Sequence, residues 1–212
     1  MIVSENSAAP RTLAPSGTHI ARCVQVIDLG TTEDVSPTYG TKIKHKVRIT
    51  WELPFELNVF DEKKGEQPFF ISQKYTVSLG EQANLRKDLE SWRGRPFTPE
   101  ELKGFDLANI LGAPCQVTIL HQKGKQSGKM REVVSAITPL AKGMVCPPAI
   151  SELVSYDVGD GENEVYRKLP KFLQEDIAKC HEWRPMDNED TQGPVHDDEY
   201  QEQGSDPDRV PF

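Results

Sequence analysis

The chain has 212 residues and a formal net charge of −8 at pH 7, a balance that by itself argues against a partner as acidic as nucleic acid. Its length suits one domain of about 150 residues with appended segments. The charge is uneven, because residues 185–212 hold nine carboxylates against one arginine and account for the whole −8. Residues 19–145 instead hold 18 Lys and Arg against 15 Asp and Glu. The sequence therefore predicts a basic folded body with an acidic tail.

The four cysteines are scattered, with no Cys-x-x-Cys pair and no histidine at metal-ligand spacing. This pattern predicts buried free thiols rather than a zinc site or a disulfide framework, and we expect no metal and no cofactor. No apolar run reaches 18 residues, and residues 1–16 lack the apolar stretch of a signal peptide. We therefore expect the protein to stay in a reducing cytoplasm.

Three strands are predicted first. Residues 19–29 are rich in β-branched and apolar side chains and run into Gly30, which begins a polar loop. In residues 42–53 apolar and mostly cationic residues alternate, a period of two that gives the strand one apolar and one cationic face. We expect Pro54 to end this second strand and residues 69–79 to form the third.

The pattern then changes to helical spacing. Apolar residues from Ala83 to Trp92 recur as on one face of a helix, which Gly94 would terminate. Residues 98–101 have the form of a capping box that opens a second, short helical turn.

Two further strands are predicted at residues 115–121 and 133–140, joined by a hairpin. The order β-β-β-α-β-β is the connectivity of the five-stranded, partly open OB-fold barrel, so the predicted fold class is mainly β. The predicted divisions are a flexible N-terminus at residues 1–16, an OB-fold DNA-binding domain at 17–145, a linker and helix packed on the barrel at 146–184, and a disordered acidic tail at 185–212.

The helix after the barrel is predicted within residues 169–183, where Pro170 can open it. We expect its apolar stripe to dock on the barrel. The stripe consists of Phe172, Leu173, Ile177 and Cys180.

The cationic face of the second strand is the first candidate binding site. Its side chains repeat every ~6.6 to 6.8 Å, twice the strand rise, which is close to the phosphate spacing of an extended single strand. No carboxylate interrupts the face before Glu52, and OB-folds hold nucleic acid on this strand. The alternative is that these lysines only solvate an outer face and protect an edge strand. The face consists of Lys42, Lys44, Lys46 and Arg48.

The hairpin between the last two strands is the second candidate site, because OB-folds use this loop to close over a bound strand. The alternative is a solvated turn. Its candidate residues are His121, Lys123, Lys125, Lys129 and Arg131.

Base stacking requires flat aromatic faces as well as cations. Tyr39 in the first loop and Tyr75 on the third strand are the predicted stacking residues, with Lys74 beside Tyr75 as a phosphate contact. Trp51 shares the apolar face of the second strand and is predicted to pack in the core, as is His45.

The sequence carries no Gly-x-Ser-x-Gly, no phosphate loop and no carboxylate pair at a recognisable nuclease spacing. Arg93 and Arg95 follow the predicted helix, and we expect them to complement its dipole rather than bind phosphate. An enzyme is therefore not expected.

Acidic residues precede a terminal Val-Pro-Phe, and this ending resembles the C-terminal tip of bacterial single-stranded DNA-binding proteins. The resemblance implies a tip that binds replication, recombination and repair proteins, with the terminal Phe in an apolar pocket. Arg209 departs from the acidic run of that family. The matching residues are Asp206, Asp208, Val210, Pro211 and Phe212.

The body resembles phage-encoded single-stranded DNA-binding proteins in the stretches GTHIARCVQVIDLGT, KVRITWELP, LRKDLESWRGRPFTPEEL and LGAPCQVTI. This resemblance spans roughly residues 17–145. It implies an OB-fold, sequence-independent binding of single-stranded DNA, and a role in phage DNA replication or recombination in the bacterial host cytoplasm. The alternatives are a non-catalytic protein-interaction module and a DNA-mimic inhibitor of a host factor.

Deleting residues 185–212 should strengthen binding to single-stranded DNA, because the acidic tail would otherwise compete with DNA for the basic face. The gain should be largest at low salt, where charges are least screened. Fluorescence anisotropy of labelled oligo-dT at several salt concentrations measures it. Equal affinity of the full and shortened chains at every salt concentration would exclude this competition.

Overall fold

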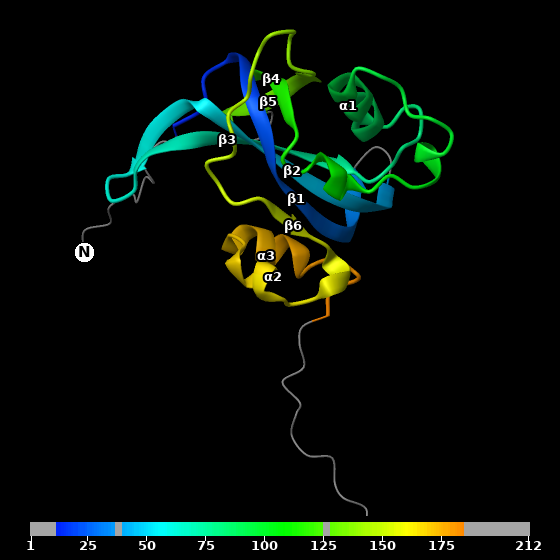
Figure 1. Cartoon of the computed structure of the whole chain (residues 1–212). Coiled ribbons are helices and arrows are strands. Elements are labelled where there is room, and N and C mark those ends of the chain that lie inside the picture. The colour runs from blue at the N-terminus through cyan, green and yellow to red at the C-terminus, as the bar shows by residue number, and fades with distance from the viewer. Residues whose placement is uncertain (1–11, 37–39, 125–127, 185–212) are drawn as a thin grey trace, which may run out of the picture.

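The computed structural model describes residues 12–36, 40–124 and 128–184, and it is mainly β. Five strands form an antiparallel sheet in the order β3-β2-β1-β4-β5, and a sixth strand pairs in parallel with β1 (Figure 1). The predicted order, with helix α1 between β3 and β4, is confirmed. The bounds are Gly17–Ser36 for β1, Gly40–Asp61 for β2, Gly65–Thr76 for β3, Asn84–Arg93 for α1, Pro114–Lys123 for β4, Met130–Thr138 for β5 and Val154–Tyr156 for β6.

The prediction that Gly30 ends the first strand is wrong, because β1 continues to Ser36. Gly30 adopts a φ of +66° at a bulge in the pairing with β2, so it bends the strand without ending it. A Cβ there would lie 2.5 Å from the Cys180 sulfur, so the glycine also allows the chain after α3 to approach closely.

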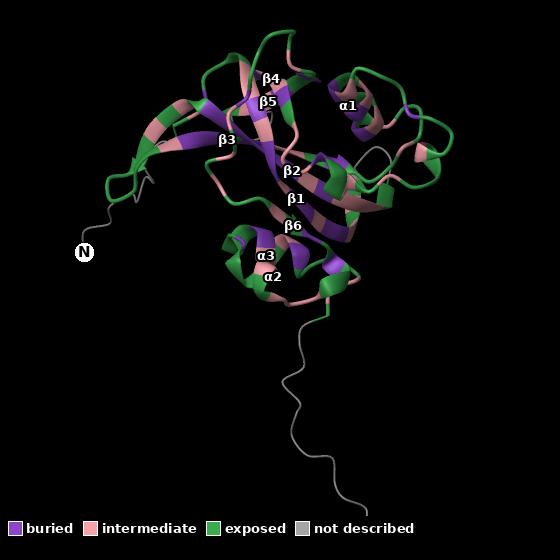
Figure 2. Cartoon of the chain, viewed as in Figure 1, coloured by how far each residue is buried: buried purple, intermediate pink, exposed green. Residues whose placement is uncertain are grey.

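The prediction that Pro54 ends the second strand is also wrong, because β2 continues to Asp61. The pairing with β3 shifts register between Leu53 and Leu57, and a bulge of this kind tolerates the missing N–H of proline. Beyond the bulge, β2 and the start of β3 form a projecting two-stranded ribbon, residues 55–68, which we call the hairpin arm (Figure 1). Figure 2 shows that much of this arm is exposed.

The helix signals are confirmed. Helix α1 ends at Arg93, and Gly94 takes the left-handed conformation at its C-cap. The capping box forms as well, because the Thr98 hydroxyl accepts from the Glu101 N–H at 3.3 Å and a Glu101 carboxylate oxygen accepts from the Thr98 N–H at 2.9 Å. The turn it opens is a short 3-10 helix, η1, at Glu101–Lys103. Arg93 and Arg95 both pair with Glu101 of this turn.

A first core lies between the sheet and α1. Trp51 is fully buried there, as predicted, and its ring lies 5.9 Å from that of Trp92 on the helix. Helix α1 contacts both β3 and β5, the two ends of the strand order. Among the described residues no backbone ladder joins these two strands, so the sheet is not closed.

A second core lies on the other side of β1, where the chain after the sheet packs. Helices α2 (Glu164–Lys168) and α3 (Lys171–Ile177) cover this side (Figure 1). Predicted docking of the C-terminal helix is confirmed, because three residues of its stripe are buried against Ile27 and Leu29 of β1. Those three are Leu173, Ile177 and Cys180, whereas Phe172 is 50% exposed and was wrongly placed in the stripe.

The connection from β5 to β6 is fixed to the sheet by polar contacts. Glu52 of β2 is completely buried, and its two carboxylate oxygens accept from the N–H groups of Ile150 and Ser151 at 2.8 Å each. Arg22 of β1 donates to the Cys146 and Pro147 carbonyl oxygens at 2.9 and 2.8 Å. The segment after residue 146 is therefore integrated into the fold, including the short strand β6 that the sequence pattern did not indicate.

The predicted N-terminal segment, residues 1–16, is described from residue 12 onward. Ala14 is fully buried in the first core, and its N–H donates to Glu132 at 3.0 Å. Its carbonyl oxygen accepts from the His121 ring at 2.8 Å. The N-terminal segment therefore covers the end of the β4–β5 pair.

All four cysteines are buried free thiols, as predicted, and burial raises the pKa of Cys23 to about 12. Within the described ranges, no helix has the length and apolar character needed to span a bilayer. The same residues contain no group of three or more His, Cys, Asp or Glu side chains placed to hold a metal.

Substituting Ile177→Ala should lower the free energy of unfolding by about 2 to 4 kcal/mol, because it opens a cavity in the second core. The matched control on the same helix is Glu175→Ala at an exposed position, which should change stability by less than about 0.5 kcal/mol. Urea denaturation of both variants measures the difference. Equal stability of the two variants would mean that α3 is not docked on β1.

Candidate nucleic-acid interface

Basic side chains of β2 and β3 gather on the side of the sheet that faces α3, which we call the outer face. Arg48 and Lys74 lie opposite each other in the register of the two strands. Lys46 and Lys44 continue the same alternation along β2, toward its start. The structure therefore brings Lys74 beside the predicted cationic face.

Carboxylates from other elements pair with these cations, although β2 itself places no carboxylate on the face before Glu52. Asp34 of β1 binds Lys46, and its second oxygen lies 3.2 Å from the Lys44 ammonium. Asp176 of α3 lies 2.6 Å from the Lys74 ammonium. The sequence of β2 did not indicate these contacts, because both partners come from neighbouring elements of the fold.

The Asp34 carboxylate is stabilised by its two lysines. Hydrogen bonds from Lys46, which has the larger effect, and from Lys44 hold the pKa of Asp34 below its usual range. Asp34 therefore stays ionised at neutral pH, where any phosphate that binds these lysines must compete with it.

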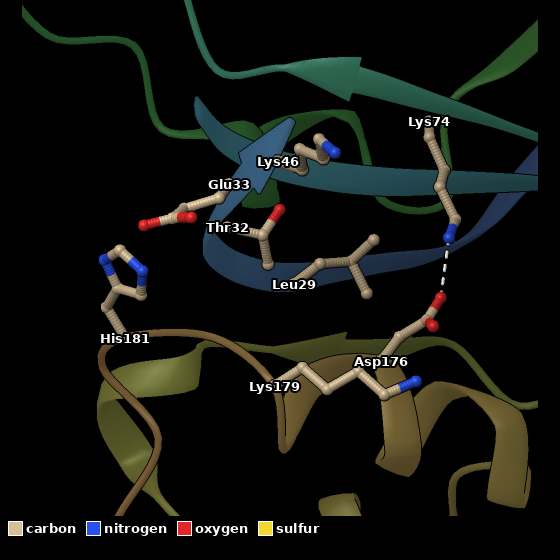
Figure 3. A pocket seen from close by; sticks show the side chains of 8 residues that line it. All are labelled: Leu29, Thr32, Glu33, Lys46, Lys74, Asp176, Lys179 and His181. Atoms are coloured by element: carbon tan, nitrogen blue, oxygen red, sulfur yellow. Dashed lines mark hydrogen bonds and ion pairs between the residues drawn. The ribbon is translucent and has the colours of Figure 1, made fainter. Parts of the chain in front are cut away.

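A cavity of about 440 Å³ lies between α3 and the outer face (Figure 3). Three lysines and a histidine border it, against two carboxylates, so its rim is net basic. Figure 3 shows Lys74 reaching across to Asp176 along one side and His181 on the loop beyond the helix. Its lining residues are Leu29, Thr32, Glu33, Lys46, Lys74, Asp176, Lys179 and His181.

Two more hollows continue this surface. One, of about 980 Å³, is lined by Lys42 and Lys44, shares Lys74 with the first cavity, and extends to Tyr75 and Leu85 on the α1 side of the sheet. The other, of about 400 Å³, lies at the N-terminal end of α3 and is bordered by Phe70 and Lys168. Each of the three hollows is thus lined by at least one basic side chain.

Arg48 of β2 contacts both β3 and the first turn of α3. Its guanidinium donates to the Ser72 hydroxyl at 2.9 Å and lies 5.1 Å from the centre of the Phe172 ring. Phe172 stays half exposed despite this contact. An exposed ring therefore lies among the cations of the outer face.

Tyr75 does not take the predicted stacking position. Its ring is 4% exposed, and its hydroxyl donates to Asp88 at 2.7 Å. Burial raises the pKa of Tyr75 above its usual range. A ring buried in the first core cannot present a face to a base, because Tyr75 alternates with the outward-facing Lys74.

His45 also differs from its predicted core position. Its side chain is 39% exposed, and its ring lies 2.6 Å from the Asp28 carboxylate. Ile43, on the same strand face, is 65% exposed, because this end of the β1–β2 pair extends beyond the core.

The second predicted set of cations lies elsewhere. Strand β4 pairs with the first residues of β1, from Gly17 to Arg22, whereas the cations of β2 pair with the opposite end of β1. The β4–β5 hairpin therefore projects away from the outer face. Its described candidates are His121, Lys123, Lys129 and Arg131.

Several other predicted residues lie outside the described residues. They are Tyr39, Lys125, and the tip residues Asp206, Asp208, Val210, Pro211 and Phe212.

Residues that the sequence analysis missed come mainly from the C-terminal segment. Phe172 was assigned to the apolar stripe, and Lys179 and His181 carry no periodic signal. On α3, however, Phe172 and Asp176 are four residues apart, which places them on one side of the helix. This spacing could have indicated that Phe172 lies on the same side of the helix as Asp176.

Comparison of the sequence with protein-family models and with curated proteins finds no match. The resemblance to phage-encoded single-stranded DNA-binding proteins therefore stays a prediction. Function is inferred from the geometry of the outer face.

Substituting Lys46→Ala should raise the pKa of Asp34 toward its usual value, because it removes the strongest hydrogen bond to that carboxylate. The control Lys74→Ala, whose lysine pairs with Asp176, should leave it unchanged. NMR titration of the carboxyl carbons measures both.

The lowered pKa of Asp34 determines how its ion pairs change the stability of the fold with pH. The folded chain binds this proton less tightly than the unfolded chain, so the ion pairs stabilise the fold above about pH 4. That contribution is lost as the pH falls through the folded pKa. An unshifted Asp34 pKa in the Lys46→Ala variant would contradict the pairing.

Proposed function

We propose that this protein binds single-stranded DNA, without sequence preference and without catalysis, on its outer face. The observation that carries the proposal is the convergence of lysines from β2, β3 and the turn after α3 around two hollows that share Lys74. Lysine is a flexible point charge that fits phosphates without reading bases. A groove of this kind suits the backbone of a single strand.

The fold supports the proposal at the level of connectivity. The strand order and the helix between β3 and β4 match an OB-type barrel, whose second and third strands bind oligonucleotides. Helix α1 bridges β3 and β5, where such a barrel would close. We propose that the sheet is a partly open OB-type barrel and that its outer face at β2 and β3 is the binding surface.

The biological role is proposed from the sequence. A chain that coats exposed strands and ends in an acidic Val-Pro-Phe tip would recruit replication or recombination proteins. We propose this role in phage DNA replication or recombination within the bacterial cytoplasm.

A second candidate is a protein-interaction module, and the hairpin arm favours it. Four apolar side chains of the arm are 44% to 63% exposed, which is unusual for a surface without a partner. They are Phe55, Leu57, Val59 and Phe60.

The decisive test replaces three lysines of the outer face, in the variant Lys44→Gln/Lys46→Gln/Lys74→Gln. Affinity for labelled oligo-dT should fall at least ~10-fold at low salt, and the slope of log K against log salt should shrink by about 2, because three phosphate contacts are lost. Fluorescence anisotropy with oligo-dT and a duplex of equal length measures affinity and strand preference.

The matched control is Lys63→Gln/Lys64→Gln/Lys103→Gln, which removes the same charge from exposed positions that border none of the hollows. It should bind like the unchanged protein. Equal losses of affinity in both variants would mean that only the net charge of the protein matters, and not the position of the lysines. Absence of any preference for the single strand in the unchanged protein would favour the protein-interaction candidate.

A further inference from the structure

Among the described residues, the exposed aromatic side chains on the outer face are Phe70 and Phe172. Phe70 alternates with Ser72 and Lys74 on β3, so it shares their side of the strand, and it is 39% exposed. Phe172 is 50% exposed at the second position of α3. Among the residues predicted to stack, Tyr75 is buried.

Both rings lie beside cations. Phe70 borders the hollow that also contains Lys168, and Phe172 lies under the Arg48 guanidinium at 5.1 Å. Arg48 is held in place by Ser72, so the guanidinium and the ring form a fixed pair. Lys74 lies opposite Arg48 in the strand register and continues the charge toward the larger hollows.

The spacing along the sheet suits successive nucleotides. Phe70 precedes Lys74 by four residues, which is ~13 Å at the rise of a strand and equals two of the repeats that separate the cations of β2. A strand that follows β3 would thus meet an aromatic ring at Phe70, a guanidinium and ring at Arg48 and Phe172, and then the lysines.

Another exposed phenylalanine shows what distinguishes this site. Phe55 on the hairpin arm is 63% exposed, but the arm and its turn carry four carboxylates against two lysines. Nucleic acid would be repelled there, whereas the outer face is net basic at its main cavity.

We infer that Phe70 and Phe172 stack on the bases of a bound single strand, with Arg48 holding the Phe172 ring in place beside the backbone. This inference rests on the proposed function. It assigns base contacts to α3, a helix outside the five-stranded sheet. The C-terminal segment is therefore part of the binding surface as well as a cover for β1.

The test compares Phe172→Ala with Phe172→Trp and Phe172→Leu, using labelled oligo-dT and an abasic oligonucleotide of the same length. Loss of stacking on one base should weaken binding of oligo-dT by about 5- to 150-fold in the Ala and Leu variants. The Trp variant should retain affinity, because it keeps an aromatic face. Binding of the abasic strand and the salt slope should not change, because no charge is removed.

Phe70→Ala should behave like Phe172→Ala, and Phe55→Ala is the control that should bind both strands normally. Unfolding midpoints of all variants verify that they are folded.

If the unchanged protein binds oligo-dT but Phe172→Ala binds it equally well, the stacking inference is wrong while the proposed function stands. An equal loss on oligo-dT and on the abasic strand would also overturn it, because the effect would then act through Arg48. If the unchanged protein binds no single strand, both proposals fail together.

Discussion

The burial of β1 on both faces is the constraint on which the rest of the structure depends. Val26 faces the first core with α1, and the next residue, Ile27, faces the second core with α2 and α3. A strand in this position must be apolar on both sides, and β1 is also hydrogen-bonded to β2, β4 and β6. Because the second core holds α3 against β1, it also holds the side of α3 that carries Asp176 next to β3. The outer face is a consequence of that packing.

The charges of the outer face are largely matched within the chain. Asp34 and Asp176 occupy three lysines that a phosphate backbone would use. Partly exposed ion pairs of this kind contribute only about 0 to 1 kcal/mol each, so exchanging a carboxylate for a phosphate costs little. The pairs therefore keep the lysines ordered without closing the surface to an anionic ligand. The same exchange would make any binding sensitive to salt.

The exposed phenylalanines of the described residues occur in two electrostatic settings. On the outer face, Phe70 and Phe172 lie among Arg48, Lys74 and Lys168, a combination that suits bases and phosphates together. On the hairpin arm, the exposed residues stand among mostly acidic neighbours, which suits a protein partner better than nucleic acid. One chain thus offers two surfaces of different character, and the charge around the rings distinguishes them.

The sequence by itself determined the local features: the order of strands and helix, the glycine that ends α1, the capping box at Thr98 and the burial of Trp51. These follow from periodicity and from contacts within a few residues. Only the tertiary structure decided that Gly30 and Pro54 lie at bulges within long strands, that Tyr75 is buried, and that Asp34 and Asp176 pair with the lysines. A period of two assigns a residue to one face of its own strand, but it does not say what covers that face. Lys74 and Asp176 are 102 residues apart in the chain, and Phe172 joins Arg48 only because the second core docks α3 on β1.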